Sequence, residues 1–380
     1  MWQNEITEKL FSTYNSYFVN DFQTRMFAPE FFNSVADNII RQAPKIFDLK
    51  EIGKSFEGRP IRLIKVGSGD IKILLWSQMH GDESTATMAI ADIFNYFAKF
   101  SDRQGVQELL SKLSLLFIPL LNPDGAARYQ RRTAQCIDIN RDAVALVTPE
   151  ARLLKEIQNE YQPDYGFNLH DQELSTVKGT REISAIAFLA PAMDEEKSDN
   201  KVRLRAKKLA AFLTEKMMEI IPGKITRYDD GYEPRAFGDS IQTWGTSTVL
   251  IESGHSIGDP EKFFIRKLNT VGLLSAFYAI VSGTYTNADI SLYEKLPGNS
   301  ERAYDLIIRN VLIRYQNGQT TPADLGISYQ VDTHTTDTPM LFEVGDLSPL
   351  VALREFDGER MLVDEVDLKI ESEFNLRKYF

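Results

Sequence analysis

The chain has 380 residues and a mass of 43.3 kDa, which exceeds what one compact core usually holds, so we expect two or three domains. Hydrophobic residues make up 43% and charged residues 26%, a balance typical of globular proteins, and no apolar run is long enough to cross a bilayer. The formal net charge of −11 disfavours contact with a phosphate backbone. We therefore expect neither nucleic acid nor a membrane as a partner.

The N-terminal sequence and the cysteine content limit the expected cellular location and the residue types that could bind a metal. Residues 1–9 lack the basic start and the apolar stretch of a secretory signal, so a cytoplasmic location is expected. Cys136 is the only cysteine, which excludes an intrachain disulfide and a thiolate metal cluster. Any metal site must therefore rely mainly on imidazole and carboxylate groups. The composition leaves the oligomeric state open.

Apolar residues at the start of the chain follow first a helical and then an alternating pattern. Residues 2–43 have helical periodicity that is interrupted around Pro29, which predicts an N-terminal helical cap over residues 1–44. Between residues 48 and 75 the apolar residues alternate, and we expect two strands joined by a tight turn at 67–70. After His80 the period changes to 3.6, which predicts a core-facing helix.

Strands and helices alternate through the middle of the chain. Buried strands are expected at 115–121, 167–169 and 248–251, and helices at 202–220 and 259–283. A further helix is expected to begin at Thr148, which can cap it, with Pro149 at its first position. This alternation predicts an α/β sheet with helices on both faces, which we assign to a domain over residues 45–290.

The pattern changes near the stretch 296–299. From about residue 300 onward, turn residues separate short alternating segments, at 306–308, 311–313, 327–331, 341–344 and 361–363. Little helical periodicity remains in this part. We expect a small β-rich domain over residues 300–380, appended to the α/β domain.

The segment His80-Gly81-Asp82-Glu83 lies between a predicted strand and a predicted helix. A His and a Glu three residues apart at the start of a helix project to the same side and can hold one ion. Taken alone, this spacing also fits a chance match or an ordinary carboxylate at a helix start. The other histidines of the chain therefore decide how it is interpreted.

A second imidazole closes a predicted buried strand, because His170 follows residues 165–169. Sheets of the α/β class bind their ligands at strand ends, where both His80 and His170 are expected. Two imidazoles and one carboxylate with an open fourth position are typical of a catalytic zinc site. We therefore predict one zinc ion held by His80, Glu83 and His170. The alternative for His170 is a hydrogen-bonded histidine at a strand edge.

The loop 131–142 carries the residue types that a carboxylate-binding site needs. Asn140 and Arg141 present an amide and a planar guanidinium fork, which can bind a substrate carboxylate bidentately. Asp138, just before this pair, could orient a zinc-bound imidazole through its other ring nitrogen. A solvated charged loop is the alternative.

Glu252 ends the apolar strand 248–251. A carboxylate at the buried end of a strand is costly unless it has a partner or a function, and the raised pKa expected there suits proton transfer. The alternative is a structural glutamate in an ion pair. His255 and His334 are both expected to lie in loops without a metal role.

Together these segments resemble the zinc carboxypeptidase family, whose members carry such motifs in this order. The matching segments are Ser55-Phe56-Glu57-Gly58-Arg59-Pro60-Ile61, His80-Gly81-Asp82-Glu83, Asn122-Pro123-Asp124-Gly125, Asp138-Ile139-Asn140-Arg141, His170 and Glu252. The resemblance covers roughly residues 45–285 and implies a mixed, twisted sheet with helices on both faces. The seven-residue step from Arg131 to Asp138 looks like the bacterial branch that includes the murein peptide amidases.

The resemblance also implies a role for each site residue. The zinc ligands would be His80, Glu83 and His170. Glu252 would be the general base and then the general acid for the metal-activated water. The terminal carboxylate of the substrate would be bound by Asn140 and Arg141. Arg131, with Arg132 as the alternative, would polarise the scissile carbonyl and stabilise its oxyanion.

The chain departs from the family pattern after the second histidine. His170 is followed by Asp171-Gln172 rather than by small and aromatic residues, and the short interval from Glu83 to His170 is nearer that of N-acyl amino acid deacylases. The substrate-capping tyrosine of the digestive enzymes has two candidates, Tyr228 and Tyr232. The segment 238–241 shows no residue that would set a side-chain preference.

We therefore expect a zinc metallopeptidase that hydrolyses the peptide or isopeptide bond next to a free C-terminal carboxylate. Its partner would be a peptide or a peptide-like substrate. Two alternatives stay open. The first is a zinc-dependent deacylase of N-acyl amino acids, and the second is a catalytically silent, peptide-binding relative.

Overall fold

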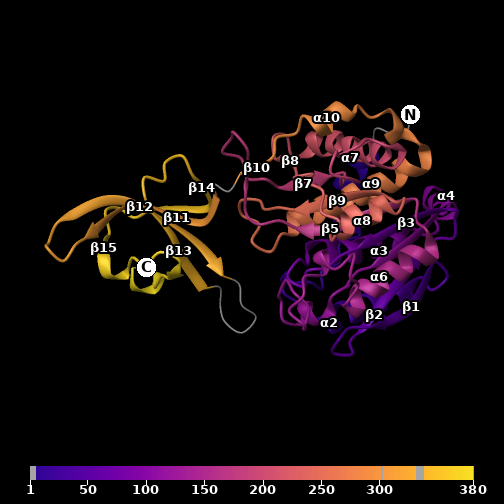
Figure 1. The fold of residues 1–380 in the computed structure, drawn as a ribbon, viewed down its shortest axis with the longest axis horizontal. Coiled ribbons are helices and arrows are strands. Elements are labelled where there is room, and N and C mark those ends of the chain that lie inside the picture. The colour runs from indigo at the N-terminus through magenta and orange to yellow at the C-terminus, as the bar shows by residue number, and fades with distance from the viewer. Residues whose placement is uncertain (1–5, 301–302, 331–337, 380) are drawn as a thin grey trace.

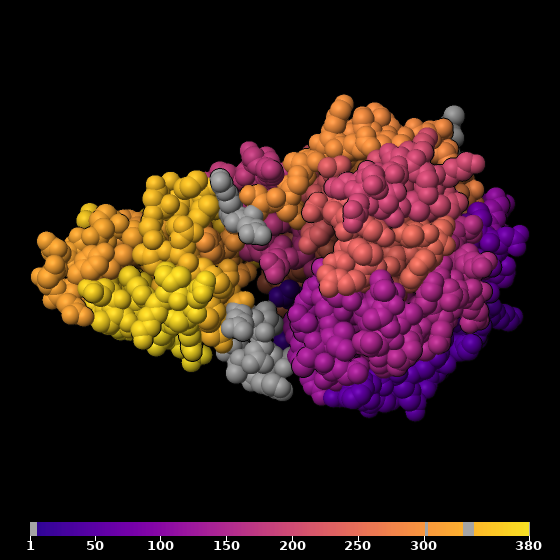
Figure 2. Space-filling model, viewed as in Figure 1, coloured from indigo at the N-terminus to yellow at the C-terminus, as the bar shows by residue number. Residues whose placement is uncertain are grey.

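The computed structural model describes residues 6–300, 303–330 and 338–379, so the expectation for His334 lies outside the described residues. A larger α/β part is followed by a smaller β-rich part (Figure 1). The space-filling view shows a gap between the facing surfaces of the two parts (Figure 2). We retain 1–44, 45–290 and 300–380 as the proposed domains.

The N-terminal segment packs onto the α/β part. Its helices are α1 (Ile6–Ser12), the 3₁₀ helix η1 (Tyr14–Ser16) and α2 (Pro29–Gln42). Pro29 occupies the first position of α2, where its missing N–H leaves no bond unmade. The interruption expected around Pro29 is therefore the irregular segment that precedes it.

A buried ion pair ties this segment to the core. The carboxylate of Asp92 accepts hydrogen bonds at 2.6 and 2.7 Å from the guanidinium of Arg266, and both side chains are fully buried. The same carboxylate accepts from the hydroxyl of Tyr14 at 2.6 Å and from the backbone N–H of Val19 at 2.8 Å. Asp92 therefore joins α3 (Thr85–Phe100), α9 (Phe263–Ser282) and the N-terminal segment.

The larger part contains a mixed sheet of eight strands. They are β1 (Phe47–Lys54), β2 (Pro60–Val66), β3 (Ile71–Trp76), β4 (Leu113–Ile118), β5 (Tyr165–Asp171), β7 (Ile186–Leu189), β8 (Ile225–Arg227) and β9 (Ser247–Ser253). The order is β1-β2-β4-β3-β5-β9-β7-β8, and the inner strands β4, β3, β5 and β9 run parallel. This arrangement confirms the predicted α/β class with a mixed sheet.

The two strands predicted on either side of the turn 67–70 are present as β2 and β3, but they do not pair with each other. Both pair with β4, which lies between them, and β1 is an additional strand. The backbone N–H of Gly69 donates to the carbonyl of Leu113 at 3.0 Å, and a Cβ at Gly69 would lie 1.9 Å from the carbonyl carbon of Lys112. Glycine lets the chain cross the start of β4, and apolar alternation alone does not reveal which strand is the neighbour.

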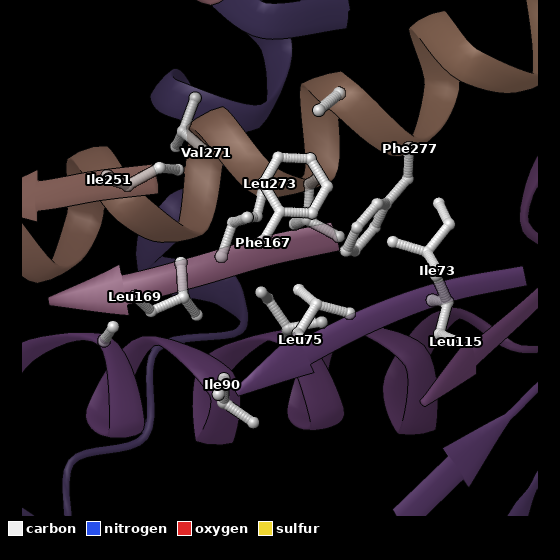
Figure 3. Close-up of a cluster of buried hydrophobic side chains, with 14 of the residues drawn as sticks. Ile73, Leu75, Ile90, Leu115, Phe167, Leu169, Ile251, Val271, Leu273 and Phe277 are labelled. Carbon is white, nitrogen blue, oxygen red and sulfur yellow. The ribbon is translucent and has the colours of Figure 1, made fainter. Parts of the chain in front are cut away.

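Helices cover both faces of this sheet. They are α3 (Thr85–Phe100), α4 (Gln104–Lys112), α5 (Pro123–Ala127), α6 (Pro149–Tyr161), α7 (Lys201–Ile220), α8 (Phe237–Thr243), α9 (Phe263–Ser282) and α10 (Ile290–Glu294). Phe167 and Leu169 of β5 point into the core that α3 and α9 cover (Figure 3). Residues of α6 and α8 pack with Trp76 in a second core on the opposite face. Thr148 caps α6 by accepting from Ala151 N–H at 3.2 Å, as predicted.

Helix α9 is the central helix of the first core. By length and composition it could cross a membrane, but 78% of its most apolar window is buried inside the protein. It packs against α1, α3 and α7. Its apolar character therefore matches its place in the core.

The smaller part is a six-stranded sheet. Its strands are β11 (Ala303–Arg314), β12 (Thr320–Gln330), β13 (Thr338–Gly345), β14 (Val351–Asp357), β15 (Leu362–Asp364) and β16 (Ser372–Glu373). The segments 306–308 and 311–313, expected as separate strands, form one strand, because β11 contains a bulge at Asn310, whose φ is 56°. The extra residue of the bulge shifts the alternation of apolar and polar residues by one position. In the sequence this shift looks like the end of one strand and the start of another.

Two contacts connect the smaller part to the loop after β5. Strand β10 (Asn299–Ser300) pairs with β6 (Thr176–Val177). The guanidinium of Arg181 donates to the backbone carbonyls of Ser348 at 2.6 Å and of Leu350 at 3.2 Å.

Candidate metal centre

The candidate site lies at the carboxyl ends of three neighbouring strands. His170 of β5 and Glu252 of β9 are register partners in parallel strands, so their side chains share one face of the sheet. His80 and Glu83 lie in the connection between β3, the other neighbour of β5, and helix α3. Residues far apart in the sequence therefore meet at one sheet edge, as the strand-end argument predicts.

The carboxylate of Glu83 lies between two imidazoles. Its Oε1 atom is 2.7 Å from Nδ1 of His80, and its Oε2 atom is 2.7 Å from Nδ1 of His170. All three side chains are buried, and one ligand atom from each lies within 4.8 Å of the others. Ligands about 2.1 Å from one zinc ion can be no more than ~4.2 Å apart, so a small movement of the side chains suffices for a shared ion.

The surroundings of the two imidazoles also fit a metal site. Nε2 of His80 lies 3.0 Å from Oδ1 of Asp138, which fixes the ring and leaves Nδ1 for a ligand. Oδ1 of Asp138 also accepts the backbone N–H of Asn140 at 2.9 Å. Two imidazoles, a carboxylate and an orienting aspartate form the donor set that catalytic zinc sites use. His255 is not part of this group.

The two carboxylates beside this group differ in charge behaviour. Burial disfavours the charged form of Asp138, but hydrogen bonding and attraction to His80, together with Arg131, lower its pKa below the usual range. For Glu252 the same two cations, His80 and Arg131, also favour the charged form, but the opposing effects are larger. Burial, followed by the negative charges of Glu83 and Asp171, holds the pKa of Glu252 well above its usual value. A carboxyl group with a raised pKa can both accept and donate a proton near neutral pH.

The structure distinguishes the two arginine candidates. The guanidinium of Arg131 donates to Oε1 of Glu83 and to Oδ2 of Asp138, both at 3.2 Å, and about half of the side chain is exposed. Arg132 instead donates to the backbone carbonyl of Cys136 at 3.2 Å. Arg131, and not Arg132, therefore lies at the candidate metal centre.

Asn140 and Arg141 lie on the short 3₁₀ helix η2 (Ile139–Arg141) that follows Asp138. Oδ1 of Asn140 accepts the backbone N–H of Phe237 at 2.9 Å, which joins this helix to the start of α8. Arg141 is 45% exposed in its side chain, and its Nε lies 3.8 Å from Glu233. Its guanidinium is therefore accessible to a ligand from solvent.

Tyr228 is the tyrosine that the structure brings to the site. Desolvation, followed by the negative charges of Glu252 and Glu83, raises its pKa to about 12, although the residue is 38% exposed. Sequence reasoning left Tyr228 and Tyr232 as equal candidates, because both lie in the irregular segment after β8. Tyr228 follows the end of β8 directly, and the charges of Glu252 and Glu83 act on it.

The two residues that depart from the family pattern have structural partners. The backbone N–H of Asp171 donates to Oε2 of Glu83 at 3.2 Å, and its carboxylate pairs with Lys262 at 3.1 Å. The side chain of Gln172 bonds Ser184 at 2.9 Å and Asn299 at 2.7 Å. The pair therefore stabilises the end of β5, which carries His170.

Two motifs of the sequence, at 55–61 and 122–125, support the turn 80–83 that carries two of the candidate metal ligands. A Cβ at Gly81 would lie 2.1 Å from the carbonyl carbon of Gly125, so the two backbones touch. Asn122 donates to the carbonyl of Met79 at 3.2 Å. Asp124 accepts from the hydroxyl of Ser55 at 2.7 Å and from the guanidinium of Arg59 at 2.7 Å. The segments at 55–61 and 122–125 therefore hold the segment 80–83 in place.

Comparison with known proteins agrees with this geometry. Residues 32–145 match the family described as zinc carboxypeptidase. Carboxypeptidase 2 of Trichophyton rubrum is 27% identical over 170 residues, which cover 42% of this chain and 31% of that protein. Carboxypeptidase B of Astacus astacus is 29% identical over 98 residues, or 25% of this chain and 32% of that protein. The chain spans about a third of the length of these curated relatives.

Solved structures share the fold. A metallo-carboxypeptidase from Burkholderia cenocepacia superposes with a TM-score of 0.53 at 18% identity, over 69% of this chain and 70% of that chain. A metallo-carboxypeptidase from Pseudomonas aeruginosa, solved with (2-guanidinoethylmercapto)succinic acid, gives 0.53 at 19% identity, over 67% and 69%. Residues 32–145 are thus similar in sequence to the zinc carboxypeptidase family, and the chain shares the fold of solved metallo-carboxypeptidases.

Proposed function

We propose that the chain is a zinc-dependent carboxypeptidase that hydrolyses the peptide or isopeptide bond next to a free C-terminal carboxylate. One observation carries this proposal: the donor group of His80, Glu83 and His170 lies beside Glu252, the register partner of His170. The match to the zinc carboxypeptidase family supports zinc as the single metal ion.

The substrate is proposed to be a peptide or a peptide-like molecule held by its terminal carboxylate. Arg141 offers a half-exposed guanidinium, and Asn140 next to it offers an amide. Charge-assisted bonds of this type are short and directional, so they position the terminal residue. Binding a free carboxylate restricts cleavage to the last bond of the chain.

The reaction divides the work among the residues of the site. A zinc ion held by His80, Glu83 and His170 would supply an activated water and Lewis-acid polarisation of the scissile carbonyl. Glu252, whose pKa is raised, accepts the proton of the attacking water and returns it to the leaving amine. Arg131 stabilises the developing oxyanion through its guanidinium.

The test is product analysis of the zinc-loaded protein by mass spectrometry on four substrate classes, with and without a chelator. The classes are peptides with a free C-terminus, their C-terminal amides, muropeptide-type isopeptides and N-acyl amino acids. Chelator-sensitive release of the terminal residue from free-carboxylate peptides or isopeptides, but not from amides, is the expected result. Cleavage confined to N-acyl amino acids would overturn the proposal in favour of a deacylase, and zinc binding without any cleavage would favour a silent, peptide-binding relative.

A further inference from the structure

Asn168 is a fully buried amide without a partner on the site face of β5. Its side chain is 0% exposed, and neither Oδ1 nor Nδ2 makes a hydrogen bond to any residue that the structure describes. A buried donor or acceptor that stays unpaired destabilises a protein by about 1–3 kcal/mol. The amide therefore requires a hydrogen-bonding group that enters from outside, or a buried water.

The position of Asn168 relates it to the metal centre. Phe167 and Leu169 point into the core under α9 (Figure 3), so Asn168 and His170 face the opposite side of the sheet. Two residues along a strand span about 6.6 Å, which places Asn168 one step below His170. Its register partner on β9 is Leu250, two residues before Glu252. The amide therefore lies beneath the line that joins His170 and Glu252.

The same amide lies against the helix start that Asn140 holds. A Cβ built on Gly238 would lie 3.3 Å from Nδ2 of Asn168. The preceding residue, Phe237, donates its backbone N–H to Oδ1 of Asn140 at 2.9 Å. The proposed carboxylate-binding loop and the buried amide therefore flank one backbone segment, 237–238. Because the proposed carboxylate site is at Asn140 and Arg141, this segment is the proposed neighbour of the last side chain of the substrate.

We propose that Asn168 makes the enzyme select substrates whose C-terminal residue has a neutral polar side chain, a carboxamide or a hydroxyl. This inference rests on the proposed carboxypeptidase function and names its substrate class. A carboxamide oxygen accepts from Nδ2 and its N–H donates to Oδ1, and a hydroxyl group also does both. Trp76, the register partner of Asn168 on β3, adds a second buried and unpartnered donor, Nε1. An apolar side chain would leave these groups unpaired, and a carboxylate would meet the lone pairs of Oδ1.

The experiment compares N-blocked dipeptides that end in three isosteric pairs: Gln and Met, Asn and Leu, and Thr and Val. The zinc-loaded protein is expected to cleave the polar member of each pair with a kcat/KM at least about tenfold higher, because a site built for hydrogen bonding rejects an apolar isostere. Asn168→Leu should abolish or reverse this ratio while cleavage of the apolar member continues. Asn159→Leu, the same change at an exposed position of α6, should leave the ratio unchanged.

A second variant and a second readout make each outcome decisive. Gly238→Ala places a methyl group near Nδ2 and should lower kcat/KM for the polar members, so the test does not depend on the folding of Asn168→Leu. Calorimetric binding of the Gln and Met dipeptides to Glu252→Gln gives the preference without turnover. A ratio near one would overturn the inference and assign the amide to a buried water, and an apolar preference would overturn it outright. Cleavage of free-carboxylate peptides without any polar preference would leave the proposed function intact, whereas no cleavage and no binding would overturn both.

Discussion

Nε2 of His80 lies 3.0 Å from Oδ1 of Asp138, while Nδ1 of the same ring faces Glu83 at 2.7 Å. Both nitrogens of this imidazole thus face a carboxylate. Glu83 is a candidate metal ligand, whereas Asp138 orients the ring. A carboxylate at the outer nitrogen fixes the tautomer and raises the basicity of the inner nitrogen. Asp138 would therefore act on the proposed zinc ion through His80, without binding the ion itself.

Removing this support should weaken the metal site without abolishing it. Asp138→Ala is expected to lower zinc affinity about 10–100-fold, measured by competition with a chromogenic chelator. Asp102→Ala, a change at an exposed carboxylate, is the control. Unchanged zinc affinity in Asp138→Ala would contradict the assignment.

Glu252→Gln separates metal binding from proton transfer. The variant should retain one zinc ion per chain by elemental analysis and lose about 10²–10⁴-fold in kcat, because the amide cannot accept a proton. Glu195→Gln, an exposed site, should behave as the unmodified protein. Retained turnover in Glu252→Gln would show that another group is the base.

Arg141→Ala tests recognition of the terminal carboxylate. A hydrogen bond to a charged group stabilises by about 1.5–3 kcal/mol, so KM for free-carboxylate peptides should rise about 10–150-fold with little change in kcat. Arg132→Ala is the matched control on the same loop, because its guanidinium bonds Cys136 instead. Equal effects of Arg141→Ala on amidated and free peptides would exclude the carboxylate role.

The pair of Asp92 and Arg266 should be important for stability. Removing one partner of a buried ion pair typically costs about 3–5 kcal/mol, so Asp92→Ala should lower the free energy of unfolding by that amount in urea titrations. Arg62→Ala, which removes a partly exposed pair with Asp37, should cost only about 0–1 kcal/mol. A small effect of Asp92→Ala would mean that the N-terminal segment does not depend on this contact.

Asp239 of α8 should make stability depend on pH. Burial raises its pKa from 3.8 to about 7, so between these values the folded chain binds a proton that the unfolded chain has released. Stability from this group is therefore present at low pH and is lost as the pH rises toward 7 and above. Urea titrations at pH 5 and pH 8 should show a smaller difference for Asp239→Asn than for the unmodified protein. An identical difference would contradict the shift.

Much of the site could be predicted because its residues end strands. His170 and Glu252 each follow a short apolar run, and the rule that α/β sheets bind ligands at strand ends then brings them together. Arg131 and Arg132 could not be separated in this way, because a loop has no period that assigns a direction to neighbouring side chains. The position of Tyr228 depends on β8, a strand of three residues that is too short to give a pattern.

The fold class could likewise be predicted, but not the pairing of its strands. Alternation identified β2 and β3, whereas the insertion of β4 between them depends on contacts with residues far along the chain. The bulge at Asn310 divided one strand into two apparent segments. The cytoplasmic location stays a prediction, since no structural feature bears on it.

The contact between Gly81 and Gly125 affects how many of the six family motifs are independent of one another. The backbone of Gly125 leaves no room for a side chain at Gly81, Asn122 leaves none at Gly125, and Asp124 binds both Ser55 and Arg59. The motifs at 55–61, 80–83 and 122–125 are thus structurally coupled. They should not be counted as three independent pieces of evidence for the family resemblance. A variant library that randomises one of these motifs alone should therefore yield few folded chains. Joint randomisation of all three should yield more, because compensating substitutions in the contacting motifs can then occur together.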